Sequence, residues 1–496
     1  MRSKRTGARL GVIAAVCTAW AAPASGETLA EAIALAYETN PTLQAQRSQV
    51  RVLDEGYVQA RAGLRPQVSI TSTASYSNTS VNAGRTGLVD TNGDGIPDTN
   101  VTASGVTERN FGNASLAVTQ PLYTGGRTVA AMSAAEADIL SARETLRDVE
   151  AGVLLNVVQT YADVLRDQRV VEIRRQDVDT LQKRLEETQA RFEVGELTRT
   201  DVAQAEARLG SSRAQLEAAE GQLEISRANY EAVVGKPPEV LAPPPPLESY
   251  LPKNVLEALD VARTESPKIQ AAELTEQASR ARVAVARAQR RPTVSVRGGY
   301  GYSGQVDPFI ADRFARNLTA SVTTTLPLYS GGVVSSQIRQ ALERNNTDRI
   351  RTQTAERQVR QAIAQSWSQM NTARGAAAAN EGVVRAAQIA VEGTRLEFSV
   401  GIRTTIDVLN AELELRNAEL SLVAARRDAY VASASLLNAI GRLEAKRLAP
   451  ETPLYDPRRS FKRVTRSGVW APVDAVAETV DRIGAPPEAA RPRKAD

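Results

Sequence analysis

Apolar and small residues recur at every seventh position over two long stretches of the chain, 127–193 and 333–399. A seven-residue repeat sustained over this distance is typical of helices that pack along a narrow seam as a coiled coil. Each stretch has 67 residues, and at about 1.5 Å per residue each helix would extend about 100 Å, too far for a compact globular domain. The recurring positions are Val157, Val164, Val171, Val178, Leu185 and Phe192, then Ile363, Met370, Ala377, Val384, Val391 and Phe398.

Shorter helical patterns flank the two long ones. Each has 36 residues, so two of them placed end to end match one long helix. The chain therefore predicts four helical columns of equal height. The four short stretches are 29–64, 199–234, 255–290 and 405–440.

Strand patterns lie between the short and the long helices. Pro66 and Pro292 end the preceding helices, and apolar residues then alternate with small polar ones. The alternation fits a transmembrane barrel and, equally well, a soluble antiparallel sheet. Four strands cannot close a membrane-spanning barrel, so several subunits would have to pool them; three protomers would supply twelve strands and twelve helical columns.

The whole pattern occurs twice. Pro-Leu-Tyr-Thr-Gly-Gly at 121–126 recurs as Pro-Leu-Tyr-Ser-Gly-Gly at 327–332. We expect an internal duplication, because landmarks that recur in order at a constant spacing indicate a repeated domain. The predicted units are a first repeat at 27–235 (helix, two strands, long helix, helix), a proline-rich linker at 236–253, a second repeat at 254–450 and a tail at 451–496.

The tail mixes Arg, Lys, Pro and Ala without helical periodicity. We expect it to be partly disordered, from about residue 480 onward, because such a composition buries little apolar surface. Part of it could wrap the helical columns as a strap.

The N-terminus has the pattern of a secretory signal peptide, predicted at 1–26. A basic start is followed by an apolar run, Leu10–Trp20, and by small residues that place cleavage after Ala24 or Gly26. The run is shorter than the roughly 20 residues of a transmembrane helix. Cys17 raises the alternative of a lipoprotein, but Val16 precedes it where a small residue would be expected.

The amino-acid composition argues against most classes of enzyme. The chain of 496 residues has no histidine and a single cysteine, so it offers no imidazole base and no Cys/His zinc site. The predicted signal peptide holds four of the 61 basic residues and no acidic one, so the mature chain balances its 57 acidic residues. We therefore expect neither an enzyme nor a nucleic-acid partner.

The duplicated halves, the Pro-Leu-Tyr-Thr/Ser-Gly-Gly motif and Phe-x-Val-Gly-x-x-Thr followed by Asp-Val together resemble the TolC family of outer-membrane channels, over about 28–450. The resemblance implies an α+β membrane protein. Its homotrimer would form a 12-stranded β-barrel, four strands per protomer, in outer-membrane lipid, continuing into a long α-helical coiled-coil barrel across the periplasm.

The family's function is that of a passive exit duct, either for a tripartite efflux pump or for type I secretion, gated at the periplasmic helical tip. Partners implied by the resemblance are a periplasmic adaptor (membrane fusion) protein and an inner-membrane RND or ABC transporter. A structural coiled-coil surface protein without transport activity is the alternative.

Two tip turns join each long helix to the next short one. Gly195 and Gly401 end the long helices, and Thr and Asp residues then cap the next ones, which is by itself a sufficient reason for these residue types. By resemblance, an inter-helix latch would also lie here. Its positions correspond to Thr200, Asp201, Phe398 and Arg403.

The resemblance also places Asp407 facing the pore, where three copies would make a cation-favouring ring. Two residues depart from the family pattern. Phe398 replaces the latch tyrosine and has no hydroxyl, and Asn410 replaces a second pore aspartate. We therefore expect a weaker ring, and a latch that depends more on Arg403 and Asp201.

A loop in the first repeat has the spacing of a calcium site. Asp90, Asn92, Asp94 and Asp98 stand at positions 1, 3, 5 and 9, with Gly95 at position 6. The twelfth position carries a valine instead of the bidentate glutamate. An exposed Gly/Asp/Asn-rich hairpin turn is the alternative interpretation, and no other cofactor is expected.

Overall fold

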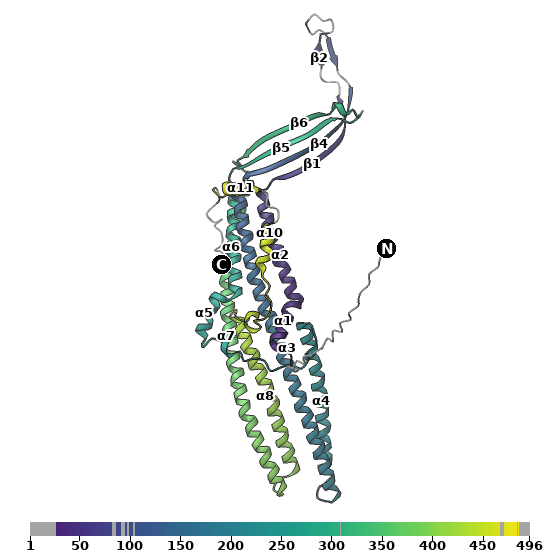
Figure 1. Ribbon diagram of the computed structural model, residues 1–496, viewed down its shortest axis with the longest axis vertical. Helices are drawn as coiled ribbons and strands as arrows, with labels where there is room; N and C mark the ends of the chain where they lie inside the picture. Colours follow the sequence, from purple (N-terminus) through teal and green to yellow (C-terminus); the bar gives the residue numbers. More distant parts are fainter. Residues whose placement is uncertain are drawn as a thin grey trace, which may run out of the picture.

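The computed structural model describes residues 26–81, 86–90, 95–96, 99–102, 105–307, 309–466, 471–483 and 485. Two helices of 67 residues, α3 (Arg127–Glu193) and α7 (Val333–Ser399), run the length of an elongated helical body (Figure 1). Both begin and end where the sequence predicts. Each follows a glycine in the left-handed conformation, Gly126 with φ 81° and Gly332 with φ 84°, which allows the sharp turn from strand to helix.

Two of the four short helices are continuous and two are broken. α4 (Arg199–Val234) and α8 (Thr405–Ala439) confirm the sequence prediction. The predicted helical stretches 29–64 and 255–290 are each divided in two: α1 (Leu29–Thr39) is followed by α2 (Pro41–Arg61) with η1 (Ala62–Leu64), and α5 (Val255–Glu265) is followed by α6 (Pro267–Ala288).

Proline causes both breaks. Asn40, before Pro41, has ψ 122°, and Ser266, before Pro267, has ψ 117°. A proline ring crowds the preceding residue out of the helical region, while the proline itself fits the first position of the next helix. Each break lets the chain change direction at the level of α1, α5 and the short helix α9 (Ala445–Leu448), which we call the equatorial region.

The largest apolar core lies in this equatorial region. Tyr161 of α3 is fully buried there, and its hydroxyl donates to the backbone oxygens of Glu27 at 2.8 Å and Ala242 at 2.6 Å. The Tyr230 hydroxyl donates to Glu27 Oε1 at 3.0 Å. These bonds attach the start of the first repeat and the proline-rich segment to the long helix. The linker also contains η2 (Glu248–Tyr250).

Four antiparallel strands form one sheet in the order β1 (Gln67–Val81), β4 (Gly105–Tyr123), β5 (Thr293–Gln305), β6 (Ala315–Thr325). The register aligns apolar residues in one cross-strand row and polar or small residues in the next, on the opposite face. The apolar row is Ile70–Leu116–Tyr300–Leu318, and the next row is Thr71–Ser115–Gly301–Asn317.

The apolar row is exposed: Ile70 retains 79% and Leu318 retains 80% of its accessible surface. Within the described residues, β1 and β6 each pair on one side only. Beyond the sheet, a hairpin of β2 (Thr86–Val89) and β3 (Thr99–Thr102) extends from the first repeat (Figure 1). Over the ranges that the structure describes, no helix combines the length and apolarity needed to cross a membrane.

The C-terminal tail is more ordered than its composition suggests. It contains α10 (Pro457–Arg466), which packs on α2, and α11 (Ala471–Ile483), which lies at the base of the sheet (Figure 1). These two helices were not predicted, because the tail sequence shows no helical periodicity and contacts with the first repeat supply the burial that its own pattern lacks. The predicted signal peptide, apart from Gly26, and residues 486–496 lie outside the described residues.

Candidate gate at the helical tip

The two tip turns have the same backbone geometry. Gly195 and Gly401 have φ values of 80° and 81°. The N–H of each glycine donates to the carbonyl three residues earlier, that of Phe192 or Phe398, at 3.0 Å. This left-handed glycine ends the long helix and satisfies carbonyls that would otherwise lack partners.

Both short helices then begin with a complete capping box. The Thr198 N–H donates to Asp201 Oδ2 at 2.9 Å, and the Asp201 N–H donates to Thr198 Oγ1 at 3.3 Å. In the second repeat, the Thr404 N–H donates to Asp407 Oδ2 at 3.0 Å, and the Thr404 hydroxyl donates to the same oxygen at 2.7 Å. Two donors on one carboxylate oxygen stabilise its charged form.

The pKa values of the two capping aspartates fall for this reason. The backbone N–H and hydroxyl of Thr404 lower the pKa of Asp407 below its ordinary value of 3.8. The Thr198 hydroxyl and N–H lower the pKa of Asp201 in the same way. Both side chains are therefore charged at neutral pH, and both are held close to their own turns.

The predicted latch residues do not meet in one cluster within the protomer. Arg403 donates to Glu397 Oε2 at 2.8 Å, within its own turn, and Asp201 binds Thr198. Thr200 is an exposed residue of the first turn of α4. Within the protomer, neither Arg403 nor Asp201 contacts the other repeat in these bonds. A latch formed by these two residues between subunits stays a prediction.

Phe398 does contact the other repeat. The Arg191 guanidinium of α3 lies 5.2 Å from the centre of the Phe398 ring of α7. An arginine over an aromatic face is attracted by the ring quadrupole. Phe398 has no hydroxyl group, but it links α7 to α3 through this cation–π contact.

Asn410 makes a second contact between the repeats. Arg208 Nη2 of α4 donates to Asn410 Oδ1 of α8 at 3.1 Å. The Asn410 amide oxygen thus accepts a hydrogen bond from the first repeat. The position of Asn410 beside the pore stays a prediction. Asp407 lies one turn earlier on the same helix.

A third contact was not found from the sequence. Glu412 of α8 retains only 5% of its accessible surface, and its Oε1 accepts from Arg395 Nη2 of α7 at 2.6 Å and from Arg184 Nη2 of α3 at 3.3 Å. Its Oε2 is buried, with no hydrogen-bond partner among the described residues. Burying a carboxylate is costly unless it is paired, so both arginines are needed to hold it there.

These three contacts, Arg184–Glu412, Arg191–Phe398 and Arg208–Asn410, all join the α3–α4 pair to the α7–α8 pair, and we call them the tip latch. The sequence gives no signal for Glu412, because the equivalent position of the first repeat is also a glutamate. This counterpart, Glu206, is exposed. The packing of the α3–α4 pair against the α7–α8 pair buries Glu412 and leaves Glu206 exposed, and the repeat pattern in the sequence does not specify this packing.

The candidate calcium loop is only partly within the described residues. Asp90 Oδ2 accepts from the Gly95 N–H at 2.7 Å, which closes a turn. Asn92, Asp94 and Asp98 lie outside the described residues. Calcium binding by this loop stays a prediction.

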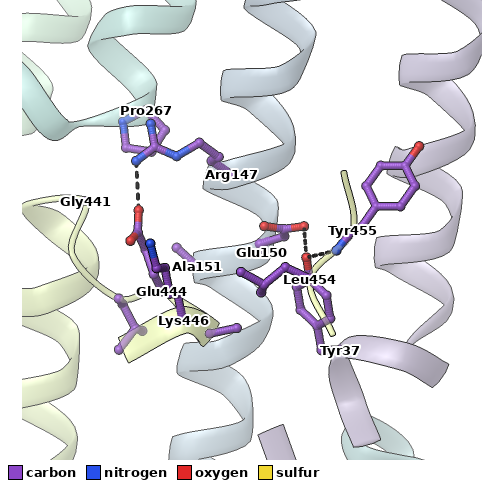
Figure 2. A pocket seen from close by; sticks show the side chains of 12 residues that line it. Tyr37, Arg147, Glu150, Ala151, Pro267, Gly441, Glu444, Lys446, Leu454 and Tyr455 are labelled. Atoms are coloured by element: carbon purple, nitrogen blue, oxygen red, sulfur yellow. Dashed lines mark hydrogen bonds and ion pairs between the residues drawn. The ribbon is translucent and has the colours of Figure 1, made fainter. Parts of the chain in front are cut away.

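A cavity of about 200 Å³ lies in the equatorial region, between α3, α9 and the start of the tail (Figure 2). The Tyr37 hydroxyl donates to Glu150 Oε1 at 3.1 Å and accepts from the Tyr455 N–H at 3.2 Å, while Arg147 donates to Glu444 at 2.9 Å. Burial raises the pKa of Glu150. The polar groups of this cavity bind one another and fasten the tail to α1 and α3.

Comparison with known proteins agrees with this architecture. The family model described as "Outer membrane efflux protein" matches residues 32–236 and 258–442, one match in each repeat. The chain belongs to this family. It is an outer-membrane efflux channel protein that extends into the periplasm, which confirms the predicted resemblance and supports the channel, not the alternative of a structural coiled-coil surface protein. The family consists of transport channels rather than enzymes.

Individual relatives of this efflux protein cover nearly its full length. The outer membrane efflux protein BepC of Brucella suis is 34% identical over 443 residues, covering 89% of this chain and 91% of BepC. TolC of Escherichia coli is 25% identical over 440 residues, covering 85% of this chain and 84% of TolC.

Among solved structures, the CmeC outer membrane channel of Campylobacter jejuni superposes with a TM-score of 0.72 at 15% identity, covering 89% of this chain and 90% of that one. The open state of the MtrE channel of Neisseria gonorrhoeae superposes with a TM-score of 0.67 at 20% identity, covering 84% of this chain and 90% of that one. At these identities the likeness shows the fold, a TolC-like channel protomer.

Proposed function

We propose that three copies of this efflux protein close into one passive duct, with the sheet in the outer membrane and the helices in the periplasm. The observation that carries the proposal is the sheet itself. Its apolar row, with Ile70 and Leu318 at the two ends, is exposed and would face the lipid, and its edge strands β1 and β6 each pair on one side only within the described residues. Open edges and an apolar face are both satisfied when neighbouring subunits complete a closed wall in lipid.

The tip latch would hold the resting duct narrow. To widen the tip, the α7–α8 pair must move away from α3–α4, and every such movement stretches Arg184–Glu412 and Arg191–Phe398. Glu412 supports the proposal most, because separation would leave its buried carboxylate with one arginine fewer. Such a loss favours the closed state.

A ring of Asp407 side chains is the proposed selectivity element. The lowered pKa keeps each carboxylate charged, and three negative charges around one axis attract cations and repel anions. The capping box fixes the orientation of this side chain, so the ring would be built from a rigid part of each turn.

A periplasmic adaptor protein and an energy-supplying inner-membrane transporter, of the RND or the ABC type, are the proposed partners. BepC is named as an efflux protein, whereas AprF of Pseudomonas aeruginosa, 25% identical over 305 residues, is named as an alkaline protease secretion protein. We favour efflux, because BepC matches 89% of this chain and AprF only 60%.

The latch is tested with Glu412→Gln in planar lipid bilayers. Removing the charge weakens both arginine bonds, and we expect the open-state probability of the resting channel to rise about tenfold, equivalent to about 1.4 kcal/mol. Glu206→Gln is the matched control, because Glu206 is the exposed counterpart in the first repeat. An equal effect of both substitutions, or no effect of either, would remove Glu412 from the gate.

A further inference from the structure

Helix α11 of the C-terminal tail has one side attached to the protein and an apolar side that is not covered. Asp481 is fully buried, while Val476, Val480 and Ile483 are exposed, Ile483 with 83% of its surface. At 100° per residue these three apolar residues share one stripe, and Asp481 points about 100° or more away from its centre. The stripe is therefore a separate face of the helix.

Asp481 fixes the position of α11. Its Oδ1 accepts from the Thr124 N–H at 2.6 Å and from the Gly126 N–H at 3.0 Å, and its Oδ2 accepts from the Val129 N–H at 3.4 Å. Gly126 precedes α3 and offers no side chain of its own as a cap. The tail thus supplies, from the far end of the chain, the carboxylate that caps the first long helix.

The fit at this junction is close. A Cβ on Gly126 would lie 2.5 Å from Cα of Ala485. The Thr124 hydroxyl also donates to both carboxylate oxygens of Asp481 at 3.0 Å. The orientation of α11 about its own axis is therefore set, and with it the direction of the apolar stripe.

The place of α11 in the molecule indicates what covers the stripe. The helix lies across the base of the sheet, at the transition from strands to helices, and contacts β4 and α3 (Figure 1). The inference rests on the proposed function, which places the sheet in the outer membrane and the helices in the periplasm, so that this level is the periplasmic surface of the membrane. The exposed apolar residues of the sheet continue down to it, since Leu122, at the base of β4, is also exposed.

We propose that α11 is an interfacial helix that lies on the periplasmic leaflet of the outer membrane, with Val476, Val480 and Ile483 inserted among the lipid chains. An amphipathic helix in the membrane plane buries such a stripe at the boundary between headgroups and acyl chains. Because Asp481 ties the same helix to the start of α3, α11 would fix the depth at which the sheet sits in the membrane.

The test uses nitroxide labels on the full chain, reconstituted in vesicles of phosphatidylethanolamine and phosphatidylglycerol. The chain's single cysteine, Cys17, lies in the predicted signal peptide, so Ile483→Cys and the adjacent control Arg482→Cys can be labelled selectively. Both side chains are exposed, but Arg482 lies away from the stripe and pairs with Glu478. We expect oxygen to reach the label at 483 and a water-soluble nickel chelate to reach the label at 482.

The expected ratio of oxygen to nickel collisions is at least threefold higher at 483 than at 482. Equal ratios would overturn the proposal. A label at 483 that neither reagent reaches would also overturn it, and would indicate instead that a second copy of the chain covers the stripe. Conductance of the same preparation in bilayers is recorded alongside, so a failure of the interfacial helix is distinguished from a failure of the duct.

Discussion

At the scale of single residues, the tip turns show how one side chain can serve both structure and function. Asp407 completes the capping box of α8 and, by that bond, acquires the lowered pKa that keeps it charged. Its residue type and position were predictable from the sequence, since Thr followed three residues later by Asp is a helix start. Glu412 was not predictable, because only the packing of α3 and α7 against α8 makes it buried.

The charge of Asp407 is tested by ion selectivity. Asp407→Asn keeps an acceptor for the Thr404 N–H but removes the charge, so we expect the preference for cations to decrease by at least half. Asp201→Asn is the matched control, because it alters the same cap in the first repeat. Reversal potentials across a salt gradient give the result, and an unchanged value for Asp407→Asn would exclude a pore position.

The lowered pKa of Asp407 also sets a direction for the pH dependence. A carboxylate whose pKa is lower in the folded protein stabilises the fold above its unfolded pKa, and this contribution is lost as the pH falls through the folded pKa. Because the pKa of Asp407 is lowered, more than half of its side chains are still charged at pH 3.8, the ordinary value for aspartate, so the cation preference should persist there and disappear only at lower pH. Loss of the preference well above pH 3.8 would contradict the capping geometry as its cause.

At the scale of elements, sequence patterns predicted the long helices, but they did not predict the helices that depend on contacts with residues far away in the sequence. α3 and α7 were predictable to the residue because a glycine precedes each and a sustained repeat fills them. The breaks before Pro41 and Pro267 were signalled by the prolines themselves, but the apolar pattern continues across them. α10 and α11 could not be predicted, because residues of the first repeat provide their partners.

The contact that holds the tail is tested with Asp481→Ala and Asp481→Asn. Loss of the carboxylate leaves the backbone N–H groups of Thr124 and Gly126 buried without an acceptor, at a cost of about 2 kcal/mol for a helix cap. We expect faster proteolytic cleavage between 451 and 483 for Asp481→Ala, and an intermediate rate for Asp481→Asn, which keeps one acceptor oxygen. Identical cleavage rates in the two variants and the unsubstituted protein would contradict the cap.

At the scale of the whole molecule, duplication produces two similar halves and the tail makes them unequal. α11 caps the start of α3, whereas the equivalent start of α7, at Gly332, follows Leu328 and Tyr329, which are both almost fully exposed in the protomer. The sequence predicted the repeat and the family. It did not predict which copy the tail binds, since both copies carry the same Gly-Gly turn.

The central claim is that the sheet of a single protomer is one part of a wall that three copies complete. Its most direct test combines two properties of one preparation: the mass of the protein extracted from outer membranes in mild detergent, and the current it carries in a planar bilayer. We predict a trimer that inserts with discrete, cation-favouring conductance steps. A monomer that leaves the bilayer without current would contradict the account.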